Sequence, residues 1–184
     1  MTDSTARGPF AVVGPSGVGK DTVIDALCAE IPGLVRARRT ITRSGEARGE
    51  DFESVDAARF LERERAGDFA LSWEAHGLRY GVPASIRSDL DAGHDVIVNL
   101  SRRVLDEARR LFPGMRVLSL TARPEVLAMR LSGRGRETAE DIAERLARAQ
   151  EFAVSGDDVI RLDNSGSLAE SVAAARAALY PESA

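Results

Sequence analysis

The sequence is poor in cysteine, in lysine and in long hydrophobic stretches. Only one of its 184 residues is a cysteine, Cys28, so an intrachain disulfide is excluded. No apolar run has the length that a bilayer span requires, and the polar segment 1–8 lacks the hydrophobic stretch of a secretory signal. The net charge of −4 does not favour nucleic acid as a partner. These absences predict a cytoplasmic protein that binds neither a membrane nor nucleic acid.

The remaining composition is that of an ordinary globular chain, with 43% hydrophobic and 29% charged residues, and its length suits a single domain. Short apolar strands alternate with helical patterns along most of it. Strands are expected at 9–13, 95–100, 116–120 and 158–162, and helices at 21–31, 102–112, 124–133, from 138 and from 167. This alternation predicts an α/β fold of three layers (αβα), with a parallel central sheet between helices.

The segment 34–80 breaks this rhythm. It is rich in arginine, glycine and acidic residues, with one helix expected at 55–66 and a short strand at 69–73. We expect it to belong to an inserted acceptor-binding lobe, 34–93, within one domain whose core comprises 8–33 and 94–184.

A phosphate-binding loop follows the first strand. The pattern G-x-x-x-x-G-K is formed by Gly14, Pro15, Ser16, Gly17, Val18, Gly19 and Lys20, with Asp21 and Thr22 opening the next helix. In a P-loop, backbone N–H groups surround the phosphates of ATP, and glycines permit this close approach. The lysine reaches the β- and γ-phosphates, so Lys20, the only lysine of the chain, is predicted to be catalytic.

Asp21 departs from this pattern, because P-loops carry a serine or threonine there as a Mg²⁺ ligand. Asp21 is predicted to serve the metal itself, since Mg²⁺ accepts carboxylate oxygens. The alternative is an acidic residue that merely complements the helix N-terminus.

Arginines gather between 123 and 148. Arg134-Gly135-Arg136 falls between two expected helices, where a lid over 131–140 is predicted. Arginines stabilise the negative charge that spreads over a phosphoryl group during transfer. Arg134 and Arg145 are therefore predicted to be catalytic, whereas Arg130 and Arg148 are expected on the surface.

Several motifs together resemble the guanylate kinase superfamily of P-loop kinases, and the resemblance covers nearly the whole chain. They are the phosphate loop, Ile41-Thr42-Arg43, Gly45-Glu46, Gly49-Glu50-Asp51-Phe52, Tyr80-Gly81 and Arg134-Gly135-Arg136-Glu137. Guanylate kinases, however, carry a glutamate at Ser72, an Asp-hydrophobic-Asp element at Asn99-Leu100-Ser101 and a phosphate-binding tyrosine at Phe52. A serine cannot replace the bidentate acceptor that reads guanine, so these departures point away from a purine acceptor.

The closer resemblance is to the ribose 1,5-bisphosphate phosphokinases. It rests on the Gly-Lys-Asp loop, Ile41-Thr42-Arg43, Leu71-Ser72-Trp73, Gly77 with Tyr80-Gly81-Val82, Val98-Asn99-Leu100-Ser101-Arg102 and Arg134-Gly135-Arg136-Glu137. The resemblance implies transfer of the ATP γ-phosphoryl group, with Mg²⁺, to ribose 1,5-bisphosphate, giving 5-phosphoribosyl 1-diphosphate as in phosphonate catabolism.

Such an acceptor needs cations for two phosphates and polar groups for ring hydroxyls. The cations are expected from Arg39, Arg43, Arg79 and Arg102, and the hydroxyl partners are Ser72, Tyr80 and Asn99. Asn164, after the last strand, is expected at the adenine. Two alternatives remain: a nucleoside monophosphate kinase acting on GMP, and a binding module that has lost catalysis.

Overall fold

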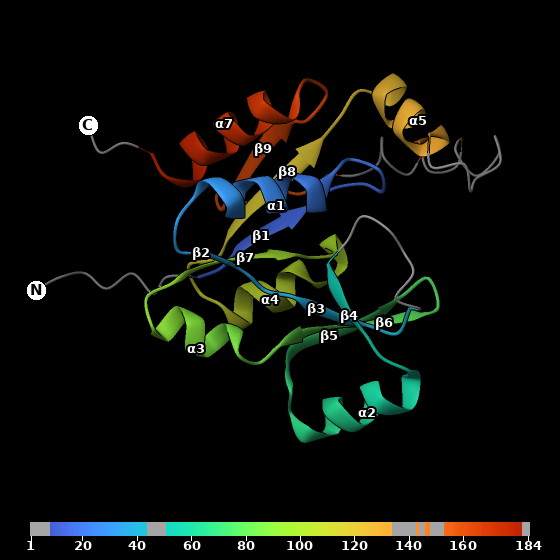
Figure 1. The fold of residues 1–184 in the computed structure, drawn as a ribbon, viewed down its shortest axis with the longest axis vertical. Coiled ribbons are helices and arrows are strands. Elements are labelled where there is room, and N and C mark those ends of the chain that lie inside the picture. The colour runs from blue at the N-terminus through green and yellow to red at the C-terminus, as the bar shows by residue number, and fades with distance from the viewer. Residues whose placement is uncertain (1–7, 44–50, 134–142, 144–145, 148–152, 182–184) are drawn as a thin grey trace, which may run out of the picture.

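The computed structural model describes residues 8–43, 51–133, 143, 146–147 and 153–181. At its centre lies a sheet of five parallel strands in the order β2-β7-β1-β8-β9 (Figure 1). Their bounds are β1 (Phe10–Val13), β2 (Leu34–Arg36), β7 (Asp95–Asn99), β8 (Arg116–Thr121) and β9 (Val159–Asp163). Ala11 of β1 lies opposite Val98 of β7 and Val117 of β8. The predicted parallel sheet is confirmed.

Helices cover both faces of this sheet (Figure 1). On one face α1 (Lys20–Glu30) packs against α7 (Leu168–Leu179), and on the other lie α3 (Ile86–Asp91) and α4 (Leu105–Leu111). Within β1, Val12 belongs to the core cluster that includes α1 and α7, whereas Ala11 belongs to the cluster that includes α4. Successive side chains of a strand point to opposite faces, so an apolar strand of this kind must be covered on both. The three-layer architecture is confirmed.

The helix ends follow their local sequence signals. α5 (Pro124–Ser132) begins with proline at its first position, as predicted. Ser167 and Glu170 form the predicted capping box of α7, and the backbone hydrogen bond from Ser167 holds the pKa of Glu170 below its usual value. The helix expected from 102 starts instead as a 3₁₀ turn, Arg102–Val104, before α4. The helix expected from 138 lies largely outside the described residues.

Strand β2 corrects the expected boundary of the lobe. Leu34–Arg36 were assigned to the lobe, but they pair in parallel with β7 at the edge of the central sheet. The strand was missed because it has only three residues, too few for a periodic pattern.

The lobe contains a second sheet, in the order β4-β3-β6-β5, and one helix. Its elements are β3 (Arg39–Ile41), β4 (Phe52–Ser54), α2 (Ala57–Ala66), β5 (Phe69–Ala75) and β6 (Leu78–Pro83). The tight turn between β5 and β6 is formed by His76 and Gly77, both with positive φ (54° and 71°), as hairpin turns of the primed types require. Phe60 of α2 stacks on Phe69 of β5, with ring centroids 4.7 Å apart.

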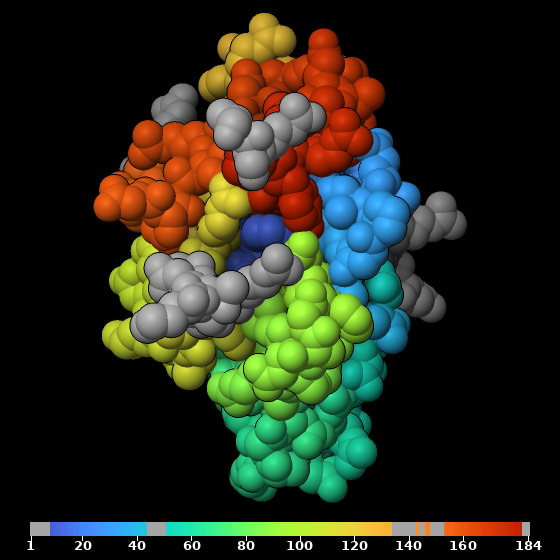
Figure 2. Space-filling view, turned by 90° about the vertical axis from the view of Figure 1, so that its left-hand side faces the viewer, coloured from blue at the N-terminus to red at the C-terminus, as the bar shows by residue number. Residues whose placement is uncertain are grey.

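The lobe shares its hydrophobic core with the central sheet. Leu71 of β5 and Val82 of β6 belong to the same buried cluster as Val98 of β7 and Leu105 of α4. The lobe (teal to green) forms one end of the molecule and α7 (red) lies toward the other (Figure 2). Shared burial of this kind supports one folding unit rather than two. None of the helices in the described ranges has the length and hydrophobicity needed to cross a bilayer.

Candidate active site

The phosphate loop follows β1 and ends where α1 begins at Lys20, so the predicted strand–loop–helix order is confirmed. Gly17 and Gly19 have φ values of 84° and 94°, which side-chain-bearing residues rarely adopt. Gly14 lies so close to its surroundings that a Cβ atom there would stand 2.8 Å from the carbonyl oxygen of Leu120. The glycines are thus required by the path of the loop, quite apart from any ligand.

The ammonium group of Lys20 lies against its own loop. Its Nζ donates hydrogen bonds to the carbonyl oxygens of Gly14, at 2.9 Å, and Pro15, at 3.2 Å. The flexible stem of lysine lets the charge turn to another acceptor. Lys20 therefore holds a positive charge at the loop, where phosphate oxygens are expected to bind.

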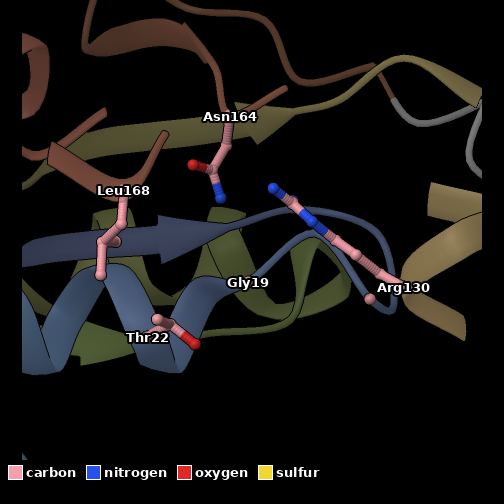
Figure 3. Close-up of a pocket in the computed structure, with 6 residues that line it drawn as sticks. Gly19, Thr22, Arg130, Asn164 and Leu168 are labelled. Atoms are coloured by element: carbon pink, nitrogen blue, oxygen red, sulfur yellow. The ribbon is translucent and has the colours of Figure 1, made fainter. Parts of the chain in front are cut away.

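Two side chains from distant parts of the chain hold the loop at the carbonyl oxygen of Val18. The Asn164 amide donates to it at 2.7 Å, and Nη1 of Arg130 donates at 3.2 Å. Figure 3 shows the two groups pointing toward each other above Gly19. Asn164 is only 4% exposed, and its backbone N–H donates to Thr121, so β8 fixes its place.

A pocket of ≈ 280 Å³ opens beside this junction. It is lined by Gly17, Gly19, Thr22, Arg130, Asn164 and Leu168 (Figure 3). Leu168, at the start of α7, is 41% exposed and offers an apolar surface there. The expectation that Arg130 is a plain surface residue was therefore wrong: its guanidinium reaches from α5 to the loop and the pocket.

Asp21 is held by residues of two neighbouring strands. Its Oδ1 accepts hydrogen bonds from Nη2 of Arg36 (2.9 Å) and from the Asn99 amide (3.1 Å), and that amide lies 3.2 Å from Oδ2. Arg36, at the end of β2, also forms an ion pair with Asp25 on the next turn of α1. The carboxylate therefore has a fixed orientation next to the phosphate loop.

The oxygen atoms at the start of α1 suit magnesium. The Asp21 carboxylate and the Thr22 hydroxyl are hard oxygen ligands, which Mg²⁺ prefers. Within the described ranges, no cluster of three or more His, Cys, Asp or Glu residues could hold a metal by itself. Mg²⁺ at phosphoryl-transfer sites is bound through one or two carboxylates and the phosphates of the substrate, so these residues fit such an ion.

Arg39, Tyr80 and Trp73 form a stack on the face of the lobe sheet that packs toward the central sheet. The Trp73 and Tyr80 rings lie 5.2 Å apart and within 5° of parallel, and the Arg39 guanidinium carbon lies 5.6 Å from the Tyr80 ring centroid. Trp73 packs against the core cluster of β7, and Arg39 is only 8% exposed. This stack fixes a cation and a phenol on the core side of the lobe.

Ser72 and Arg79 lie on the other face of that sheet, beside α2. The Ser72 hydroxyl donates to Oε1 of Glu64 at 2.6 Å, and Nη1 of Arg79 lies 3.9 Å from Oε2 of the same carboxylate. Arg79 also pairs with Glu74, at 3.3 Å. The structure thus separates these two predicted acceptor residues from Arg39 and Tyr80.

The remaining predicted site residues lie at the end of the lobe sheet, just after β7, or outside the described residues. The Arg43 guanidinium carbon lies 4.7 Å from the Phe52 ring centroid, at the end of the lobe sheet. Arg102 is exposed at the 3₁₀ turn that follows β7. Arg134 and Arg145, and most of the predicted lid, lie outside the described residues.

Sequence reasoning missed two residues of this site, Arg36 and Arg130. Arg36 gave no signal because the short strand β2 was not recognised. A signal for Arg130 was available, since it lies one helical turn before the Arg134-Gly135-Arg136 segment, but a charged residue on a helix is usually solvated.

The chain resembles known proteins over nearly its full length. No protein-family model matches the chain. A ribose 1,5-bisphosphate phosphokinase PhnN from Ruegeria sp. (strain TM1040) is 49% identical over 183 residues, which cover 98% of this chain and 96% of the relative. The protein of the same name from Pseudomonas paraeruginosa is 48% identical over 168 residues, 89% of this chain and 90% of the relative.

Among solved structures, a guanylate kinase from Anaplasma phagocytophilum matches with a TM-score of 0.67 and 18% identity over 95% of this chain and 85% of that one. A gluconokinase from Sinorhizobium meliloti matches with a TM-score of 0.53 and 21% identity, over 95% and 92%. These two likenesses show the fold alone. The identity to the curated relatives extends over nearly the full length, and the chain therefore belongs to the family of the ribose 1,5-bisphosphate phosphokinases.

Proposed function

We propose that this protein transfers the γ-phosphoryl group of ATP to the 1-phosphate of ribose 1,5-bisphosphate, giving 5-phosphoribosyl 1-diphosphate and ADP. The observation that carries the proposal is the 49% identity, over 98% of the chain, to a relative named for this substrate. The site supports it, because a phosphate loop with its lysine lies beside a lobe that presents arginines.

The donor is assigned to the core, made of 8–36 and 94–184. The backbone N–H groups of the loop and Lys20 would bind the phosphates of ATP. The pocket between Arg130, Asn164 and Leu168 would take the base and ribose of the nucleotide. Asp21 and Thr22 would hold Mg²⁺, which would neutralise the charge of the ATP phosphates.

The acceptor is assigned to the lobe, now 37–93, and the end of β7. Arg39 would bind an acceptor phosphate, with the Tyr80 hydroxyl beside it, and Arg43 and Arg102 would supply further positive charge. The Asn99 amide nitrogen is engaged with Asp21, so its amide oxygen is the atom that would accept a ribose hydroxyl. Ser72 and Arg79 would act through the shape of the lobe, because both contact Glu64.

The chemistry needs little help from a base. A phosphate monoester loses its second proton near pH 6, so the attacking 1-phosphate oxygen is ionised at neutral pH. This oxygen forms a bond to the γ-phosphorus while the bond to the β,γ-bridging oxygen breaks, and ADP leaves. Catalysis then depends on alignment and on positive charge over the moving group, for which Lys20, Arg134 and Arg145 are proposed.

The test is ADP release with ribose 1,5-bisphosphate or GMP as acceptor, each at sub-millimolar concentration. We expect turnover of the sugar bisphosphate, little of GMP, and none above background in the Lys20→Ala variant. Fast turnover of GMP with none of the sugar bisphosphate would contradict the proposal and favour a guanylate kinase. Unchanged ATP binding and unchanged activity in Lys20→Ala would together favour a binding module.

A further inference from the structure

Asp21 of the phosphate loop and Asn99 at the end of β7 differ in type from the residues that P-loop enzymes usually have at these two positions. In P-loop enzymes a Ser or Thr of the loop and an aspartate from the Walker B strand hold the Mg²⁺. Here the loop position is Asp21, and β7, the strand beside β1, ends at Asn99. The carboxylate is therefore on the loop, and a neutral side chain stands at the end of the strand.

The two side chains are in direct contact. The Asn99 amide nitrogen lies 3.1 Å and 3.2 Å from the two carboxylate oxygens of Asp21, and Asn99 is only 6% exposed. An amide oxygen facing a carboxylate would be repelled, so this contact also fixes which way the amide points. Asn99 therefore cannot turn its nitrogen to another partner without releasing Asp21.

Arg36 completes the arrangement. It donates to Asp21 at 2.9 Å, and the side chains of the two residues are 14% and 18% exposed. A charge-assisted hydrogen bond at this degree of burial is stronger than one at the open surface. Asp21 thus receives hydrogen bonds from both Arg36 and Asn99, each donor coming from a different strand of the central sheet.

We infer that Asn99 and Arg36 are positioning residues, which hold Asp21 as the carboxylate that serves the metal of the Mg–ATP complex. The pair retains one carboxylate and one neutral partner, and Arg36 adds a positive charge at hydrogen-bond distance from the carboxylate. Partners that orient metal-binding groups typically change metal affinity by about 10- to 100-fold when removed. The inference rests on the donor half of the proposed function and is independent of the acceptor.

The experiment measures Mn²⁺ affinity by electron paramagnetic resonance, in the presence of the non-hydrolysable analogue AMP-PNP and without any acceptor. We expect Asn99→Leu, Arg36→Met and Asp21→Asn each to weaken Mn²⁺ binding by about 10-fold or more. In the Asp21→Asn background, Asn99→Leu should have little further effect, because it acts through Asp21. The exchange Asp21→Asn with Asn99→Asp should recover affinity relative to Asp21→Asn alone, since it restores a carboxylate to the pair.

Arg59→Met, at an exposed ion pair on α2, is the matched control and should bind Mn²⁺ as the unaltered protein does. Wild-type Mn²⁺ affinity in Asn99→Leu would overturn the inference and leave Asn99 only its proposed contact with the acceptor. The inference would also be overturned if the effects of Asp21→Asn and Asn99→Leu on Mn²⁺ affinity were fully additive. It would be overturned as well if the exchange variant bound Mn²⁺ no more tightly than Asp21→Asn alone. Arg36→Met tests the same claim without altering the buried end of β7. Failure of the unaltered protein to turn over the sugar bisphosphate would instead refute the acceptor assignment alone.

Discussion

Replacing Gly19 with alanine tests how the phosphate loop is held. Gly19 has a φ of 94°, and an added Cβ would stand 2.9 Å from the amide nitrogen of Asn164. That nitrogen donates a hydrogen bond to the carbonyl oxygen of Val18. The left-handed backbone costs about 1–2 kcal/mol for a residue with a side chain. Displacing the Asn164 amide removes a hydrogen bond worth about 0.5–1.5 kcal/mol. Arg130 still donates to the same carbonyl, so no further loss is added and we expect a total of about 1.5–3.5 kcal/mol.

Gly33→Ala is the matched control. Gly33 has a φ of 85°, and an added Cβ would meet nothing within 4 Å. The Gly33→Ala variant should therefore lose only the stability that the left-handed backbone costs. Urea unfolding of both variants gives the difference between their losses in free energy of unfolding, which we expect to be about 1 kcal/mol. AMP-PNP binding should fall in Gly19→Ala and stay unchanged in Gly33→Ala. Equal stability losses in the two variants would refute the role of the Asn164 contact.

Three further predictions concern stability. A hydrogen bond from Arg63 holds the pKa of Glu53 below its usual value, so its stabilising effect is present above the unfolded-state pKa, near 4.5, and is lost as pH falls through the folded-state value. The stability gap between the unaltered protein and Glu53→Gln should therefore close in acid, as followed by thermal unfolding. Arg109 and Asp158 form an ion pair with two hydrogen bonds, at 2.8 and 2.9 Å. Arg109→Met breaks it and should lower the free energy of unfolding by about 1.5–3 kcal/mol in urea denaturation; an unchanged free energy would refute this. The buried Ser171 hydroxyl has no hydrogen-bond partner among the described residues, so Ser171→Ala should leave stability equal or higher; a clear loss in thermal unfolding would contradict this.

The fold and the path of the phosphate loop were predictable because their signals are local. The spacing of Gly14, Gly19 and Lys20 dictates a backbone path, and the apolar strand before it must be buried on both faces. The capping box at Ser167 likewise lies within four residues. Such signals can be read from the sequence because each depends only on residues that are close together along the chain.

The arrangement of the lobe residues was less predictable because it depends on strand register. Ser72 and Trp73 are adjacent, yet Ser72 contacts α2 while Trp73 stacks on Tyr80. Adjacent residues of a strand point to opposite faces in any register. The pairing of Ser72 with Gly81 and of Trp73 with Tyr80 sets which neighbours each one meets, and a β-bulge between Phe69 and Leu71 shifts the register upstream. No residue pattern shows that register in advance, nor the contact of Asn99 with Asp21 across 78 positions.

The most direct test of the proposed reaction is to follow its phosphorus atoms. ³¹P NMR of a mixture of the protein, Mg–ATP and ribose 1,5-bisphosphate should show the sugar 1-phosphate signal replaced by a diphosphate on the sugar, with one ADP formed for each. ADP accompanied by free phosphate, with the sugar bisphosphate unchanged, would contradict the proposed acceptor.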